Sequence, residues 1–114
     1  MLFFKFLIIS IITINYKQAE VTNQLLASLA SVTWSRIEVI VVDNNSGEKD
    51  FELLNNSYRN VKIVRNNKNL GFAGANNIGI KVSSGDYILL LIVLVFENFN
   101  SIYITNDKRP KSTA

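Results

Sequence analysis

The stretch that decides the fold is RIEVIVVDNNS, residues 36–46 of the chain. Residues 36–43 are almost continuously apolar and β-branched, which is typical of a strand buried on both faces of a parallel sheet. The Asn-Asn-Ser-Gly run at 44–47 then predicts a turn. A buried strand that ends in a polar turn is therefore the centre of the predicted fold.

Strand and helix patterns alternate along the chain on both sides of this stretch. Apolar β-branched runs predict strands, and apolar residues spaced along one helical face predict helices. The predicted strands are residues 7–14, 36–43, 61–64 and 87–96, and the predicted helices are residues 21–32, 51–54 and 73–82, with Ser46 or Asp50 as the cap of the second helix. Such alternation indicates parallel strands joined by right-handed crossovers. The predicted fold class is α/β, a Rossmann-like parallel sheet with helices on both faces.

The composition excludes several classes of protein. The chain has 114 residues, 48% of them hydrophobic and 18% charged, which fits one globular domain rather than a disordered chain. It has no Cys, which excludes disulfides and thiolate chemistry, and no His, which removes the commonest general base. A net charge of +3 from scattered basic residues does not indicate a nucleic-acid partner. Asparagine is frequent, with 15 residues, most of them in predicted loops.

The two ends of the chain leave alternatives open. Residues 1–14, MLFFKFLIISIITI, resemble a signal-peptide core, but no small-residue cleavage site follows, and the run is too short to span a membrane. We expect a buried strand here, with a small membrane-associated or exported protein as the alternative. At the other end, we expect residues 102–105 to fold back as an antiparallel strand and residues 106–114 to be a disordered tail.

Polar residues follow each of the first three predicted strands. They are Asn15 and Tyr16, then residues 43–46, then the Asn- and Gly-containing segment 66–74. In an open parallel sheet, ligands bind outside the carboxyl ends of the strands, near the point where the strand order reverses. These three segments are therefore the candidate binding loops.

Four blocks around these positions resemble one enzyme family. ISIITINYK (9–17), EVIVVDNNS (38–46), NLGFAGANNIGI (69–80) and GDYILLL (85–91) are similar, in order and spacing, to the amino-terminal half of inverting family 2 glycosyltransferases. The resemblance implies a partial GT-A fold over residues 1–96, a UDP- or dTDP-sugar as donor and a glycan as acceptor. NLGFAGANN is most similar to the branch that transfers rhamnose or galactofuranose. The resemblance also implies a cytoplasmic location, with peripheral contact at the inner membrane face as an open alternative.

The resemblance further implies a nucleotide-binding role for the residues that match the family's motifs: Asn15, Tyr16, Asp43, Asn44, Gly71, Phe72, Gly74 and Asn77. A tyrosine ring can cover a nucleobase, and a carboxylate or amide can accept its N–H groups. Small residues at a helix start let phosphate approach the backbone. Structural alternatives stay open, with Tyr16 packing at a strand end, Asp43 capping the following turn and Asn77 as a solvated amide.

The resemblance stops at Leu91, after which the family places the acidic motif that holds Mg²⁺ or Mn²⁺. Here the chain continues Ile92-Val93-Leu94, whose side chains carry no oxygen, so we expect the metal site to be absent. The acceptor-binding part and the general base also have no counterpart, and no catalytic residue is assigned. We therefore expect a truncated or frameshifted glycosyltransferase that is catalytically incomplete by itself, with residues 97–114 as a tail outside the family. A non-catalytic nucleotide-binding fragment is the alternative function.

Overall fold

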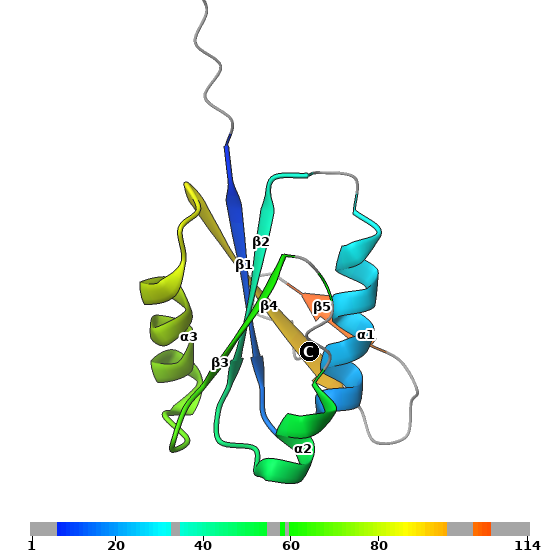
Figure 1. Ribbon diagram of the computed structural model, residues 1–114, viewed down its shortest axis with the longest axis vertical. Coiled ribbons are helices and arrows are strands. Elements are labelled where there is room, and N and C mark those ends of the chain that lie inside the picture. Colours follow the sequence, from blue (N-terminus) through cyan, green and yellow to red (C-terminus); the bar gives the residue numbers. More distant parts are fainter. Residues whose placement is uncertain (1–6, 33–34, 55–57, 59, 96–101, 106–114) are drawn as a thin grey trace, which may run out of the picture.

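The computed structural model describes residues 7–32, 35–54, 58, 60–95 and 102–105, which form a sheet flanked by helices (Figure 1). The elements follow in the order β1 (Ile9–Asn15), α1 (Ala19–Ala30), β2 (Ile37–Asp43), α2 (Glu48–Leu53), β3 (Val61–Arg65), α3 (Gly71–Val82), β4 (Tyr87–Val95) and β5 (Ile102–Thr105). Each predicted strand and helix is present, and all but α2 begin and end within two residues of the predicted bounds. The α/β fold class is confirmed.

The strand order is β3-β2-β1-β4-β5, in which β1 to β4 are parallel and β5 is antiparallel to β4. The chain runs outward from β1 to β3 and then returns across the sheet to form β4 on the other side of β1. The strand order therefore reverses between β1 and β4. Sheets of this kind bind ligands near the point of reversal, outside the carboxyl ends of the strands. The return also puts α3 on the face opposite α1 and α2 (Figure 1).

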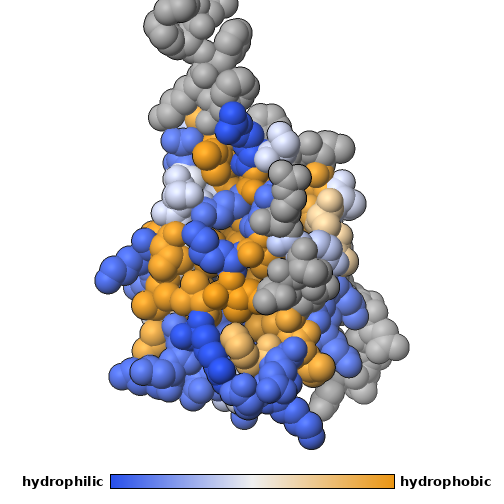
Figure 2. All heavy atoms as spheres, viewed as in Figure 1, coloured by the Kyte–Doolittle hydropathy of each residue, from blue (hydrophilic) through white to orange (hydrophobic). Residues whose placement is uncertain are grey.

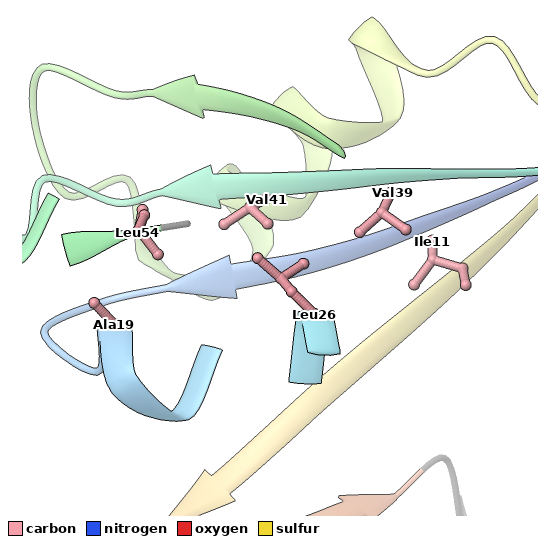
Figure 3. Packing of buried hydrophobic residues seen from close by; sticks show 6 residues of the cluster. All are labelled: Ile11, Ala19, Leu26, Val39, Val41 and Leu54. Atoms are coloured by element: carbon pink, nitrogen blue, oxygen red, sulfur yellow. The ribbon is translucent and has the colours of Figure 1, made fainter. Parts of the chain in front are cut away.

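Each face of the sheet has its own hydrophobic core, because successive residues of a strand point to opposite sides. One core joins the sheet to α1 and to the segment around α2; its buried members are Ile11, Ala19, Leu26, Val39, Val41 and Leu54 (Figure 3). The other joins the sheet to α3, and its buried members are Ile12, Ile40, Val42 and Ala75. β2 is thus buried on both faces from Val39 onward, as its β-branched sequence predicted.

Gly79 sets how closely α3 approaches the sheet. A Cβ atom at this position would lie 2.5 Å from Cγ2 of Ile12 and 3.2 Å from Cγ2 of Val42. Any larger residue would push the helix away from the strands or force the core to repack. The close contact fixes the position of α3, whose first turn lies at the carboxyl edge of the sheet.

Two predictions about helix ends are wrong. Val32, expected inside the first helix, lies beyond the end of α1 and is 45% exposed. α2 begins at Glu48, earlier than predicted, and neither Ser46 nor Asp50 caps it, because Gly47 occupies the N-cap position with no side-chain bond. The side chains of Ser46 and Asp50 instead accept hydrogen bonds from backbone N–H groups that follow β1. Buried long-range partners thus replace the local cap that sequence spacing suggested.

β4 has a neighbouring strand on its outer edge along only part of its length. β1 pairs with Tyr87 to Leu91 on one side, whereas β5 pairs with Ile92 to Val95 on the other. Among the described residues, the first half of β4 therefore has no strand beyond it. Its exposed apolar side chains, between 36% and 58% accessible, are Tyr87, Ile88, Leu89 and Leu90.

Parts of three predictions lie outside the described residues. They are the start of the apolar amino-terminal run (1–6), the domain boundary after residue 96, and the tail at 106–114. The described part of the amino-terminal run forms β1, a strand in the middle of the sheet. In the described part of the chain, no helix combines the length and the apolar character needed to cross a membrane.

Candidate functional site

The loops that follow β1, β2 and β3 meet at the carboxyl edge of the sheet, where α2 and α3 begin (Figure 1). Backbone hydrogen bonds join them, since Asn44 N donates to Asn15 O and Asn66 N donates to Asp43 O, both at 2.9 Å. On the face shown in Figure 2, this end of the molecule is mostly hydrophilic, below hydrophobic residues over the middle. The three segments chosen from the sequence therefore form one polar edge.

Asn15, the last residue of β1, is fully buried at the centre of a first polar cluster. Its Nδ2 donates to Asp43 Oδ1 at 2.8 Å and to Asp50 Oδ2 at 2.9 Å. Its Oδ1 accepts from Thr22 Oγ1 at 2.7 Å. One amide thus ties together β1, β2, α1 and α2, which gives Asn15 a scaffolding role in this edge.

Asp43, the last residue of β2, is also fully buried and caps the turn that follows. Its Oδ2 accepts from Ser46 N at 3.2 Å, and its Oδ1 accepts from Ser46 Oγ at 2.7 Å. Between them, Asn45 has φ +65°, in the left-handed region that asparagine tolerates. The turn directs Ser46 toward β1, where its Oγ accepts from Lys17 N at 2.8 Å. The capping role that the sequence left open for Asp43 is therefore present.

Asp50 links α2 to the start of α1. Gln18, the N-cap residue of α1, makes no side-chain capping bond. Asp50 Oδ1 instead accepts from Ala19 N at 3.1 Å. A carboxylate at a helix N-terminus also interacts favourably with the helix dipole. The amino end of α1 is thus held by a residue that lies far along the chain.

Asn44 is the centre of a second polar cluster and is only 3% exposed. Its Nδ2 donates to Asn69 Oδ1 at 2.9 Å and to Gly71 O at 3.3 Å. Its Oδ1 accepts from Leu70 N at 2.9 Å and from Asn66 Nδ2 at 3.2 Å. Both hydrogens and both lone pairs of the amide are used, so Asn44 fastens the loop before α3 to the end of β2.

Four residues have exposed side chains: Tyr16 and Lys17 in the loop after β1, and Phe72 and Asn77 in α3. Tyr16 is 41% exposed, and Lys17 Nζ lies 5.2 Å from the centre of its ring, a cation–π contact. Phe72 is 54% exposed in the first turn of α3. Aromatic rings beside a cation and a helix N-terminus suit a planar base that carries phosphate.

The two glycines of the predicted site are required for different reasons. Gly71 has φ +74°, and no atom lies within 4 Å of the place where its Cβ would be, so the backbone conformation requires glycine and the space beside it is open. At Gly74, a Cβ would lie 2.8 Å from Cβ of Leu70. Packing against the preceding turn therefore accounts for Gly74, whereas Gly71 leaves room for a ligand at the start of α3.

An ion pair lies where β3 ends at this edge. Arg65 donates to Glu48 Oε2, and its guanidinium lies 4.1 Å from the centre of the Phe51 ring. The hydrogen bond from Arg65 holds the pKa of Glu48 below its ordinary value. The contact joins the end of β3 to α2, and the charges of Arg65 and Glu48 offset each other there.

The described residues do not fit the Mg²⁺ or Mn²⁺ ion that the family resemblance implies. Among them, no group of three or more His, Cys, Asp or Glu side chains could hold a metal ion. Ile92 and Val93, where the resemblance places the family's acidic motif, have hydrocarbon side chains, and Val93 is 8% exposed. Hard divalent cations need oxygen ligands, which these residues lack.

A cavity of about 460 Å³ lies at the opposite end of the strands. Its lining comes from the end of α1 and the starts of β2 and β3, and it includes Leu29, Ile37, Tyr58 and Val61. Most of its lining residues are apolar, and none of them belongs to the two polar clusters. This cavity is therefore separate from the candidate site.

Sequence reasoning missed the residues that connect the loops. Thr22 has no role in the sequence prediction, Asp50 has only a local capping role, and Ser46, Asn66 and Asn69 belong to the candidate loops without any predicted partner. The available signal was the Asp-x-x-Ser spacing of Asp43 and Ser46, which is typical of a side-chain-capped turn. Their bonds to the segment after β1 have no such local signal.

The fold and the site are those of an α/β ligand-binding domain. Its polar loops meet at the carboxyl edge of a parallel sheet, where such domains bind ligands. Residues 10–91 match the family described as Glycosyl transferase family 2. The chain belongs to this family. The match ends at the last β4 residue that pairs with β1, Leu91.

Two relatives illustrate the extent of the similarity. An uncharacterised glycosyltransferase of Haemophilus influenzae is 34% identical over 107 residues, covering 91% of this chain and 40% of the relative. The Escherichia coli enzyme named UDP-Glc:alpha-D-GlcNAc-diphosphoundecaprenol beta-1,3-glucosyltransferase WfaP is 29% identical over 85 residues, covering 74% of this chain and 34% of the relative. The chain thus spans well under half the length of these curated relatives.

Solved structures share the fold. TarS of S. aureus, residues 1–349, superposes with a TM-score of 0.64 and 27% identity over 75% of this chain and 27% of that chain. Its complex with UDP-GlcNAc has a TM-score of 0.60 and 25% identity over 75% of this chain and 26% of that chain. The mannosyltransferase PcManGT from Pyrobaculum calidifontis, solved with GDP-Man and Mn²⁺, has a TM-score of 0.59 at 18% identity over 75% and 26%, a likeness of fold alone. The predicted GT-A type of fold is confirmed.

Proposed function

We propose that this chain is the donor-binding half of a family 2 glycosyltransferase and binds the nucleotide of a nucleotide-sugar at the carboxyl edge of its sheet. The observation that carries the proposal is the junction of three strand-end loops, together with the exposed rings of Tyr16, which follows β1, and Phe72, in the first turn of α3. Either ring can stack on a base, and the open start of α3 at Gly71 can face the diphosphate. The likeness to TarS, which was solved with UDP-GlcNAc, supports this assignment.

The predicted binding residues fall into two groups by burial. We propose direct contact for the exposed side chains of Tyr16, Phe72 and Asn77 and for the backbone of Gly71. The buried side chains of Asn15, Asp43 and Asn44, together with the tightly packed Gly74, are proposed to support these contacts from below. Asp43 is fully buried, so a base N–H reaches its carboxylate only if the surrounding loops move.

UDP is the first nucleotide to test, and dTDP the second. WfaP is named for UDP-Glc, and TarS was solved with UDP-GlcNAc. The proposed transfer of rhamnose or galactofuranose rests on the NLGFAGANN block alone. A donor panel should therefore include dTDP-rhamnose and UDP-galactofuranose beside UDP-Glc, with a glycan as the proposed acceptor class.

We propose that this chain binds the nucleotide without transferring sugar by itself. The apolar residues Ile92 and Val93 offer no ligand to the Mg²⁺ or Mn²⁺ that the family resemblance implies. Sugar transfer that requires Mg²⁺ or Mn²⁺ would contradict this proposal.

A cytoplasmic location, with a peripheral contact at a membrane through residues 1–7, is also proposed. Its test is membrane fractionation: the chain should sediment with membranes, be released by carbonate, and lose this association when these residues are deleted.

The decisive experiment is a titration with UDP and dTDP, with and without Mn²⁺, followed by the amide NMR signals. We expect UDP to shift the signals of Tyr16, Lys17 and Phe72 equally with and without the metal. Tyr16→Ala should weaken UDP binding by about fivefold or more, since base–aromatic stacking contributes on the order of 1–3 kcal/mol. Tyr87→Ala is the matched control, because Tyr87 is 58% exposed at the opposite end of the sheet. Equal weakening by both variants, or no shift at millimolar UDP, would refute the proposal.

A further inference from the structure

We infer that Ser46 is a positioning residue that holds the turn after β1 in the conformation that presents Tyr16 and Lys17 to the nucleotide. The inference rests on the proposed function. Lys17 has φ +55°, in the left-handed backbone region that lysine rarely adopts. Such conformations persist only where surrounding contacts impose them, and they concentrate at ligand sites.

The contact that imposes this conformation comes from Ser46. Its Oγ accepts from Lys17 N at 2.8 Å and from Asn15 Nδ2 at 3.2 Å, and it donates to Asp43 Oδ1 at 2.7 Å. The two hydrogens of Asn15 Nδ2 also point to Asp43 and Asp50, so the bond from Lys17 N and the bond to Asp43 are the principal ones of this hydroxyl. The carboxylate of Asp43 orients the hydroxyl, and the hydroxyl in turn holds the backbone of Lys17.

Ser46 is itself held in place by a second left-handed residue. Asn45, with φ +65°, turns the chain so that Ser46 N also donates to Asp43 Oδ2 at 3.2 Å. The turns after β1 and β2 are therefore linked through one hydroxyl. Without it, Lys17 is free to relax to an ordinary right-handed conformation, which reorients the peptide between Tyr16 and Lys17. The Tyr16 ring and the Lys17 ammonium group, which lie 5.2 Å apart, would then no longer face the same side of the molecule.

The test compares Ser46→Ala with Ser46→Thr, which retains the hydroxyl. Ser46→Ala should weaken UDP binding about fivefold, the equivalent of one lost hydrogen bond, and should speed hydrogen exchange of the Lys17 amide beyond the change in global stability. Ser46→Thr should restore both quantities toward the wild-type values. Ser28→Ala is the matched control, since the Ser28 hydroxyl bonds only within α1, to Gln24 O, on an exposed surface. It should change neither quantity.

The outcomes separate positioning from a purely structural role. If Ser46→Ala loses protection of the Lys17 amide but binds UDP within twofold of the wild type, the positioning role is refuted. If Ser46→Ala does not fold, Ser46→Cys replaces it, because a thiol keeps the shape but accepts hydrogen bonds weakly. If the wild-type chain binds no UDP, the proposed function fails. The inference about the turn is tested separately: it is refuted if hydrogen exchange of the Lys17 amide is the same in Ser46→Cys as in the wild type.

Discussion

Replacing Asn44 by aspartate changes one atom group in a side chain that makes four hydrogen bonds within the candidate site. The amide Nδ2, which donates to Asn69 Oδ1 and Gly71 O, becomes a carboxylate oxygen that can only accept. The oxygen that accepts from Leu70 N and Asn66 Nδ2 is retained. Two attractive contacts thus become contacts between oxygens at 2.9 and 3.3 Å, with almost no change in volume.

The expected loss of stability follows from these contacts. Each lost hydrogen bond contributes about 1 kcal/mol, and a buried oxygen left among acceptors adds about 1 kcal/mol or more. Because Asn44 is only 3% exposed, water can compensate for little of this loss. We therefore expect Asn44→Asp to lower the free energy of unfolding by about 3 kcal/mol at pH 7.

Urea unfolding followed by circular dichroism measures this loss. With a slope of about 1.5 kcal/mol per molar urea for a domain of this size, the midpoint should fall by about 2 M. Burial among acceptors raises the pKa of the new carboxyl in the folded state. Folding therefore favours the neutral form of this carboxyl. The difference in urea midpoint between the variant and the wild type should be greatest above the raised pKa. The difference should narrow as the pH falls toward the unfolded-state value of about 3.9, where the protonated carboxyl of the variant donates again.

Asn45→Asp is the matched control, since it makes the same chemical change one residue further along the chain. Asn45 is exposed and has φ +65°, a conformation that aspartate also tolerates. Its midpoint should stay within about 0.3 M of the wild type, as is usual for surface substitutions. If Asn44→Asp is as stable as Asn45→Asp at pH 7, the bonding scheme assigned to Asn44 is wrong.

Two further predictions concern other parts of the fold. Burial opposes ionisation of Glu38, but hydrogen bonds from Ser10, Ser84 and Lys62 outweigh it and hold the pKa of Glu38 below its ordinary value. The ionised carboxylate therefore contributes stability that is present above the unfolded-state pKa, about 4.3, and is lost as the pH falls through the lower folded-state value. Urea midpoints between pH 7 and 3 should fall less steeply for Glu38→Gln than for the wild type; parallel curves would count against this account. Secondly, Ile88→Lys adds a charge to the part of β4 that has no outer strand among the described residues, and it should reduce aggregation measured by light scattering. Ile80→Lys is the control, since Ile80 is 39% exposed but lies on α3, and it should not reduce aggregation. An equal effect of both variants would argue against aggregation through the strand edge.

Most of the fold could be predicted because its signals are local. The β-branched run of β2 and the helical spacing in α1 predict these elements without reference to the rest of the chain. The alternation of strands and helices then indicated parallel pairing and the edge at which the loops would meet. Helix ends were less predictable, as Val32 illustrates, because they depend on which side chains satisfy the terminal backbone groups.

The candidate site divides in the same way. Its position and residue types follow from the sequence, since Asn15, Asp43 and Asn44 come at the ends of the strands that the hydrophobic pattern predicts. The pattern cannot tell which of these side chains face a ligand and which are consumed by bonds to one another. Ser46 shows why: its local spacing suggests a cap for α2, yet its hydroxyl bonds to the backbone of Lys17, 29 residues away.

The sequence by itself determined the order of the elements, the burial of β2, the family and the edge that carries the polar loops, because periodicity and motif blocks depend on neighbouring residues. Only the tertiary structure decided that Asn15 and Asn44 are bonded internally, that Tyr16 and Phe72 stay exposed, and that Asp50 caps α1. The physical reason is that a buried polar group must find its partner wherever the fold brings one within about 3 Å, whatever the separation along the chain.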